Sequence, residues 1–423
     1  MIKKSNFNIN YISFKENILY FVILFLPIFL ILGNGVVNSF ILLVTLVYIA
    51  ECIFKKKILF HDKYEFKIFF IFYLYLIFNS LLSSDLEISL IRSLGYIKFF
   101  IFVLVYLDFF KQKRNLKVIS FVWIAILTLL NLDITYQSIF GKDIFGFDSG
   151  NPVRNSGFFF EELVAGGYLL GFSFLSVFIF NYKKYKFWQY SFILFCFVAC
   201  ILSGERSNTI KFFLIFALSH FVIFQISFKE IKKKVIFIIP IILILISIAY
   251  YKSADLKERY LSTISFSSKD NISFTDKYLT SAYGSHTLSA IFIFKENFLI
   301  GVGNKSFRIE CGKFENNVRD VQRKIDPEIA DILVSCSTHP HQIYNELLSE
   351  HGIIGTTIII LLISLLVLNR LKKKNISYIN FVSLFYILSV FIPILPSGSF
   401  FTTFNATIFW INFLLFLNIK NKK

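Results

Sequence analysis

The chain has 423 residues, of which 56% are hydrophobic, 19% aromatic and only 17% charged, and its formal net charge is +17. Its apolar residues come in runs of roughly 15–20, the length that crosses a hydrocarbon core of about 30 Å as a helix. A soluble helix would show one apolar stripe, and barrel strands would alternate. This composition excludes a soluble protein and predicts an all-α polytopic membrane protein.

The apolar runs predict about twelve transmembrane helices in a single membrane domain that covers residues 1–423. They lie near residues 18–32, 36–54, 66–82, 94–110, 118–133, 161–180, 187–202, 209–228, 235–251, 353–369, 376–395 and 404–418. Most of the 44 Lys and Arg residues fall on the connections that this order places on one side. Such a bias marks the cytoplasmic side, so both termini are expected there. The positive charge therefore indicates topology, and no nucleic-acid partner is expected. The polar N-terminal residues predict no cleavable signal peptide.

Three polar segments are expected on the opposite, outer face: residues 131–162, residues 203–208, and a large loop at 252–340 between the ninth and tenth spans. An arginine at the membrane boundary is costly unless it is paired or hydrated. Arg206 either forms a structural pair with Glu205 or presents its guanidinium to a phosphate that arrives from the bilayer. Arg154 and Arg92 are further candidates for the same cationic pocket.

The large loop is expected to be mostly helical, around the apolar run 290–294 and a turn at 301–303. Cys311 and Cys336 both lie in this loop, where oxidising conditions permit a disulfide; two buried thiols are the alternative. The remaining cysteines lie in spans and are expected to pack as small apolar residues. Four basic residues of the loop are expected on a solvated face, namely Arg308, Arg319, Arg323 and Lys324.

The most informative segment is the polar stretch at 339–355, which closes the loop just before a late span. Ser337 or Thr338 is a candidate helix N-cap, Pro340 suits the first turn and Gly352 suits the C′ position. His341 would then lie in the first turn, where the helix macrodipole opposes a positive charge. This favours the neutral imidazole, which can accept a proton near pH 7.

Other polar residues of this helix are expected to support His341. Tyr344 and Asn345 would share its face, and either Glu346 or Glu350 could orient a histidine. The alternative is that His341 is an interfacial polar residue with no chemistry.

A metal site built from histidines is the competing hypothesis for His286, His339, His341 and His351. Their spacing matches none of the common zinc patterns, so neither a metal nor another cofactor is expected. The chain also has no Asp-x-Asp pair, G-x-S-x-G elbow, P-loop or Cys-x-x-Cys motif. No acidic residue lies deep within an expected span, which weakens a proton-coupled transporter.

His341-Gln342, nine further residues and then Gly352-Ile-Ile-Gly355 resemble the pattern H-[N/S/Q]-x9-G-x-x-[G/T/Y] of the bacterial O-antigen ligase family. Residues 203–206, 151–157 and 298–303 also resemble segments of that family. The resemblance implies an inner-membrane glycosyltransferase with a periplasmic large loop. Its donor would be a glycan linked to polyprenyl (undecaprenyl) diphosphate, and its acceptor a sugar hydroxyl of the lipid A-core of lipopolysaccharide.

The resemblance also implies roles for individual residues. His341 would take the proton of the acceptor hydroxyl, and Arg206 with Arg154 would stabilise the diphosphate leaving group, while Gln342 and Asn345 would help to bind substrate. Members of the family usually carry another arginine early in the large loop. Here that region reads Tyr283-Gly-Ser-His286, so His286 could take the place of the arginine as a hydrogen-bond donor.

Several alternatives stay open at this point. The same domain occurs in O-antigen polymerases and in protein O-oligosaccharyltransferases, which differ from ligases in their acceptor. A transporter of lipid-linked glycans would need no His341, and a non-catalytic assembly protein would tolerate substitution of both the histidine and the arginines.

Overall fold

The computed structural model describes residues 2–111, 116–149, 151, 153–179, 186–220, 273–327, 335–373, 375–393 and 395–418. Within these residues the ordered elements are helices and no strand occurs, so the predicted all-α class is confirmed. The elements are α1 (Ile2–Ile31), α2 (Asn34–Lys55), α3 (Tyr64–Leu81), α4 (Leu86–Phe109), α5 (Leu116–Phe140), η1 (Gly157–Phe159), α6 (Ala165–Phe178), α7 (Lys186–Leu202), α8 (Arg206–Ser219), α11 (Phe274–Leu279), α12 (Ala282–Glu296), α13 (Phe307–Glu310), η4 (Cys311–Phe314), α14 (Glu315–Arg323), α16 (Ile343–Lys372), α17 (Tyr378–Val390) and α18 (Thr403–Leu417).

Six of the described helices are long and apolar enough to cross a membrane, namely α1 from Phe14 onward, α2, α3, α4, α5 and α16. Four more, α6, most of α7, α17 and α18, are apolar but only 10–17 residues long. The protein is therefore a multi-pass membrane protein. The expected count of twelve spans is not established, because the span expected at 235–251 and the end of the one at 209–228 lie outside the described residues.

Two helices without a polar face form the centre of the helix bundle. α18 is buried along nearly its whole length, and so is α6. A helix that is apolar on all sides is expected to lie in the interior of a bundle. Several polar side chains here are paired, as where Trp410 Nε1 donates to the Tyr96 hydroxyl over 2.9 Å.

The long helix α16 is broken at Gly352, which has φ 62° and ψ −170°. The sequence therefore predicted the interruption correctly, although the chain resumes a helical course to Lys372. A break exposes backbone groups that must find other partners, and the loop at 298–303 supplies them. The four bonds run from Val302 N to Ser349 O, Gly303 N to Glu350 O, Ile353 N to Phe298 O and Ile354 N to Leu299 O, over 3.0, 2.8, 2.9 and 3.2 Å.

Glycines allow the loop and the broken helix to approach this closely. A Cβ atom on Gly301 would lie 2.5 Å from the backbone of residues 350–352, and one on Gly352 would lie 2.5 Å from the backbone of residues 299–300. Both residues also have positive φ, which favours glycine. The loop thus fixes the direction in which the first half of α16 leaves the membrane span.

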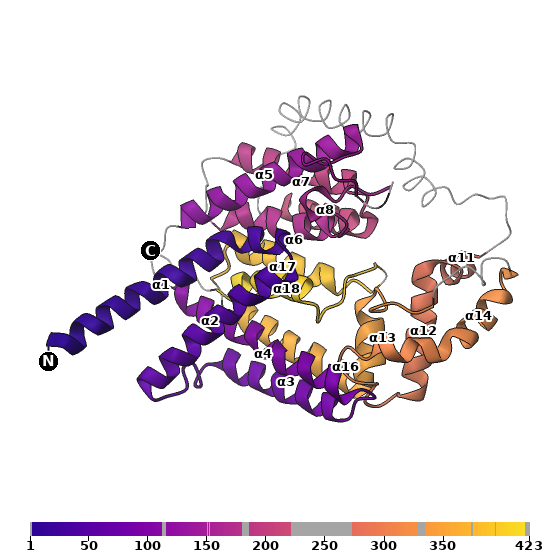
Figure 1. Cartoon of the computed structure of the whole chain (residues 1–423), viewed down its shortest axis with the longest axis horizontal. Helices are drawn as coiled ribbons and strands as arrows, with labels where there is room; N and C mark the ends of the chain where they lie inside the picture. The colour runs from indigo at the N-terminus through magenta and orange to yellow at the C-terminus, as the bar shows by residue number, and fades with distance from the viewer. Residues whose placement is uncertain are drawn as a thin grey trace.

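The helices α11, α12 and α14 gather at one end of the bundle, on the side away from both chain termini (Figure 1). They belong to the loop expected at 252–340, whose described parts are largely helical as predicted, while its residues 252–272 and 328–334 lie outside the described part. α12 packs against α16. Cys311 and Cys336 form a disulfide across this region, with Cα atoms 5.1 Å apart.

Candidate functional site

His341 lies immediately before α16, and the predicted helix start was wrong by a few residues. The helix begins at Ile343, and its N-cap is Gln342, whose side-chain oxygen accepts from Asn345 N over 2.8 Å. The predicted cap Ser337 instead binds locally, with its hydroxyl donating to His339 O. His341 therefore lies outside the first turn and has a left-handed backbone, φ 54°.

Contacts from distant parts of the chain hold this conformation. The carbonyl oxygen of His341 accepts from Ser397 N over 2.8 Å. Gln342 Nε2 donates to Pro393 O over 2.6 Å, and Asn345 Nδ2 donates to Thr287 Oγ1 on α12 over 2.9 Å. The predicted role of Gln342 and Asn345 in substrate binding stays a prediction, since both amides already position the start of α16.

Three histidine rings cluster at this point. The centroid of the His341 ring lies 4.0 Å from that of His339 and 5.3 Å from that of His286, and Tyr283 packs edge-on against it at 5.7 Å. His286 comes from the second turn of α12, where its Nδ1 lies 3.3 Å from Ser335 O. His286 lies early in the large loop, in the region where the resembling family usually carries an arginine. This region thus contacts the His341 ring through His286.

The surroundings of the cluster keep its imidazoles neutral. Burial, reinforced by the neighbouring His339 and His286, lowers the pKa of His341 to about 3, and Glu346 opposes the shift. Burial, with Lys305 and Arg308 nearby, lowers the pKa of His339 to about 3. Burial also lowers the pKa of His286. The neutral form that the sequence predicted is therefore favoured, but by burial and neighbouring groups and not by a helix macrodipole.

His351 lies apart from these rings and was wrongly grouped with them as a metal candidate. It is fully buried within α16, where its Nδ1 lies 3.3 Å from the Tyr75 hydroxyl and its ring packs on Phe401. No group of three or more His, Cys, Asp or Glu side chains in the described part of the chain is arranged to hold a metal ion.

Arg154, and not Arg206, is the ion-pair partner of Glu205. Arg154 Nη2 lies 3.6 Å from Glu205 Oε1 and donates to Leu163 O over 2.8 Å. The same carboxylate accepts from Gly166 N, in the first turn of α6, over 2.8 Å. Burial raises the pKa of Glu205, while Arg154 and these hydrogen bonds oppose the shift. The charge of Arg154 also helps to lower the pKa of His341, so Arg154 lies on the periphery of the histidine cluster.

The turn that carries Arg206 is joined to His341 by a single peptide group. The carbonyl of Pro396 accepts from Ser207 Oγ over 2.9 Å and from Lys211 Nζ over 3.0 Å. The N–H of the same Pro396–Ser397 peptide donates to His341 O. Arg206 is the first residue of α8 and is half-buried. The structure thus brings the predicted arginine and histidine segments to one place, while Arg92 lies exposed on α4.

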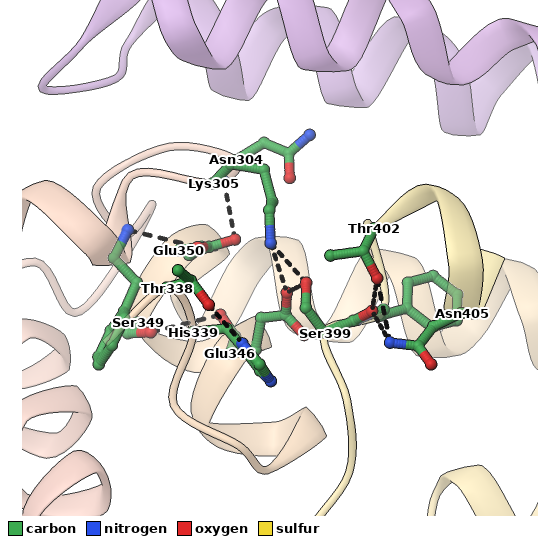
Figure 2. A network of polar contacts seen from close by, with 12 residues as sticks. Asn304, Lys305, Thr338, His339, Glu346, Ser349, Glu350, Ser399, Thr402 and Asn405 are labelled. Atoms are coloured by element: carbon green, nitrogen blue, oxygen red, sulfur yellow. Dashed lines mark hydrogen bonds and ion pairs between the residues drawn. The ribbon is translucent and has the colours of Figure 1, made fainter. Parts of the chain in front are cut away.

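A buried ionic network that the sequence did not reveal lies beside the cluster. Lys305 Nζ donates to Ser399 Oγ and lies 3.5 Å from Glu346 Oε1 (Figure 2). Glu350 accepts from the backbone N–H groups of Lys305 and Phe307 over 2.8 and 3.3 Å. The prediction that Glu346 or Glu350 orients a histidine directly was wrong, because the described contacts of both carboxylates are with other groups.

The prediction that Arg308 lies on a solvated face was also wrong. The predicted solvated face holds for Arg319, which pairs with Glu315 on the exposed side of α14. Arg308 is half-buried, and its charge contributes to the lowered pKa of His339. The Cys311–Cys336 bridge accounts for this position, since Cys336 Sγ lies 3.8 Å from Arg308 O and ties α13 to the segment that leads to His339.

Comparison with known proteins gives one family. Residues 191–360 match the family model described as O-antigen ligase. The resemblance carried by His341, Gln342 and Gly352 is therefore confirmed for this part of the chain. The match supports a membrane glycosyltransferase of the O-antigen ligase or polymerase type.

The matched region contains Arg206, His286, Lys305 and His341, whereas Arg154 and the 395–400 segment lie outside it. No curated protein matches the sequence. The match therefore supports a reaction type only for the matched part, and the structure supplies the contacts that the rest of the chain makes with these residues.

Proposed function

We propose that the protein is an O-antigen ligase of the bacterial inner membrane. It transfers a glycan from polyprenyl (undecaprenyl) diphosphate to a sugar hydroxyl of the lipid A-core in lipopolysaccharide biosynthesis. The observation that carries this proposal is the link from neutral His341, through the Pro396–Ser397 peptide, to the turn that begins with Arg206. A proton acceptor and a guanidinium in neighbouring segments suit an attack on a glycosyl diphosphate.

In the proposed reaction the acceptor hydroxyl oxygen forms a bond to the anomeric carbon, and its proton goes to His341. The bond between that carbon and the diphosphate oxygen breaks, and its electron pair leaves with the diphosphate. Arg206 and Arg154 stabilise the resulting charge, as fixed cations in a water-poor site do most effectively. Direct attack inverts the anomeric configuration.

The approach of a diphosphate also affects His341. Burial and positive neighbours lower its pKa in the free protein, and a nearby anion favours the protonated form. Donor binding therefore makes His341 a stronger base when the acceptor arrives. Because side-chain cations stabilise the leaving group, we expect transfer by the purified protein to persist in excess chelator.

The topology forms part of this proposal. Both termini lie in the cytoplasm, and the loop that leads to His341 lies in the periplasm, where the lipid-linked donor and the lipid A-core meet. This places the reaction at the outer surface of the inner membrane.

The test is the glycan profile of a deletion strain that carries either the wild-type protein or His341→Ala. With the deletion or His341→Ala, we expect bare core and long glycan retained on the prenyl carrier, with the variant present in the membrane at the wild-type level. Core capped by a single repeat would assign the protein to the polymerases. A normal profile with His341→Ala would contradict the mechanism and favour a transporter or an assembly protein.

A further inference from the structure

Glu346 is a buried carboxylate, only 1% exposed, in the first turn of α16. Its two oxygens bind the 395–400 segment: Oε1 accepts from Ser399 Oγ, and Oε2 accepts from Phe400 N over 2.8 Å. Lys305 supplies the opposite charge, 3.5 Å from Oε1, and also donates to Ser399 Oγ. Figure 2 shows the Lys305 ammonium directed at both groups.

The 395–400 segment is therefore attached to the beginning of α16 at two points. Ser397 N binds the carbonyl oxygen of His341, and Ser399 with Phe400 binds the carboxylate of Glu346. Two attachments a few residues apart restrict rotation of the segment as well as its translation. The carbonyl of Pro396, between Leu395 and Ser397, is then presented to Ser207 and Lys211 of α8.

His341 needs such a support because its own backbone conformation is unfavourable. A non-glycine residue with positive φ costs free energy unless the surrounding structure holds it, and His341 has φ 54°. Lys305 has the same feature, with φ 64°, and its N–H is bound by Glu350. Charge-assisted hydrogen bonds in a buried site are the strong ones, so the Glu346–Ser399–Lys305 contact is well suited to hold the segment.

We propose that Glu346, Ser399 and Lys305 are positioning residues for His341, which set its place relative to the turn of Arg206 through the 395–400 segment. This inference rests on the proposed function, since it assigns these residues to the same transfer reaction. None of the three is proposed to touch the substrate.

Glu346 also supports His341 through its charge, in addition to holding the 395–400 segment. The groups that face the ring are His339 from its own segment, His286 and Tyr283 from α12, Arg154 from the segment before α6, and Glu346 from α16. Glu346 carries the negative charge in this set. An opposite charge stabilises the imidazolium that forms when His341 takes the acceptor proton.

The experiment compares purified Ser399→Ala with the wild-type protein in a reconstituted transfer assay with lipid-linked glycan and lipid A-core. A small misplacement of a catalytic group can cost roughly 100-fold in rate, so we expect kcat to fall by roughly 10–100-fold. KM for the donor should change less than about twofold, because the positioning residues bind no substrate. Ser399→Thr, which keeps the hydroxyl, should recover most of the kcat.

Thr402→Val is the matched control. Thr402 Oγ1 donates to Ser399 O over 2.9 Å, on the side away from Glu346. When the Thr402 hydroxyl is removed, Asn405 Nδ2 can still donate to the same carbonyl, which it contacts over 3.1 Å. This variant should keep the wild-type kcat. If Ser399→Ala does not accumulate in the membrane, Lys305→Met is measured for the same loss of kcat.

Different results would contradict the positioning role and the proposed function. A wild-type kcat in Ser399→Ala, or in Lys305→Met where that variant replaces it, together with an inactive His341→Ala, would overturn the positioning role and leave the proposed function in place. Full transfer by His341→Ala would overturn the proposed function itself. A loss in Ser399→Ala that Ser399→Thr does not recover would also contradict the inference.

Discussion

Ser207 and His341 bind opposite sides of one peptide group. The hydroxyl of Ser207 donates to Pro396 O over 2.9 Å, and the N–H of Ser397 donates to His341 O over 2.8 Å. The C=O and N–H of a trans peptide point in opposite directions in a rigid plane. The distance between the two residues is therefore fixed by covalent geometry and two hydrogen bonds. Residues more than a hundred positions apart are in this way held as one site.

Replacing Arg206 tests whether its guanidinium acts on the substrate. A planar guanidinium binds two phosphate oxygens at once, which an ammonium cannot do. We expect Arg206→Ala to lower kcat by roughly 100-fold or more, by the loss of one charge-stabilising donor, and Arg206→Lys to recover only part. Steady-state kinetics of the purified variants measures this. Equal activity of Arg206→Lys and the wild type would argue against two-point binding.

Replacing Arg154 should reduce stability because it leaves Glu205 buried without its ion-pair partner. Removal of one member of a buried pair costs about 3 kcal/mol, and Arg154→Ala should lower the thermal unfolding midpoint accordingly. Arg154→Ala combined with Glu205→Gln should regain part of the loss. Arg319→Ala, which breaks an exposed pair on α14, is the control and should cost at most about 0.5 kcal/mol. A wild-type midpoint in Arg154→Ala would contradict the pairing.

Acidification should destabilise the protein through the histidine cluster. His339 and His341 have pKa values lowered to about 3, below the ordinary value of 6.5. Between these two values the unfolded chain binds more protons than the folded chain, so stability falls as the pH falls through this window and is fully retained above it. Unfolding midpoints at pH 7.5 and pH 5 should differ more for the wild type than for His339→Gln/His341→Gln. An equal difference would show that other groups cause the pH dependence.

The Cys311–Cys336 bridge should stabilise the segment that leads to His339. It closes a loop with a sequence separation of 25 residues, for which chain entropy gives about 3 kcal/mol. Cys311→Ser should lower the unfolding midpoint and abolish the mobility difference between reduced and non-reduced protein on a gel. A mobility difference that persists in Cys311→Ser would exclude this bridge. Cys52→Ser, which removes a free cysteine, is the control.

Gly301→Ala should disrupt the support of the broken helix. Its Cβ would lie 2.5 Å from the backbone of residues 350–352, and its φ is 74°. Because backbone atoms cannot move aside as a side chain can, the loop must separate from α16, and we expect a loss of several kcal/mol. Gly312→Ala is the matched control in the same loop, since its Cβ would meet nothing within 4 Å. Equal stability of the two variants would contradict this account of the contact.

The sequence was most informative where the signal is local. Runs of apolar residues predicted the helical class and the position of the long helices, because a helix in lipid satisfies its own backbone groups. The same holds for the interruption at Gly352, which depends on a residue that tolerates positive φ. The spacing from His341 to Gly355 likewise indicated a resemblance to the O-antigen ligase family, and the match over residues 191–360 supports it.

The sequence failed where a residue's partner comes from elsewhere in the chain. Glu205 stands next to Arg206, yet it pairs with Arg154, and neighbours along a chain need not face each other. Lys305 had no sequence feature that separates it from the other charged residues of the loop, but it is 3% exposed and lies between Ser399 and Glu346. The Pro-Ser-Gly-Ser run at 396–399 indicates only a turn, and its contact with His341 has no local signal.

By itself the sequence determined a helical membrane protein, its resemblance to the O-antigen ligase family and the histidine at the head of a late span, since composition, periodicity and spacing are properties of the chain alone. Only the tertiary structure decided how these residues form a site. It set the backbone conformation of His341, brought three histidine rings together, and placed the Pro396–Ser397 peptide group between His341 and α8. These depend on hydrogen bonds and charges between segments that are distant in the sequence. Burial at that meeting point sets the protonation of the histidines, and burial exists only once the chain has folded.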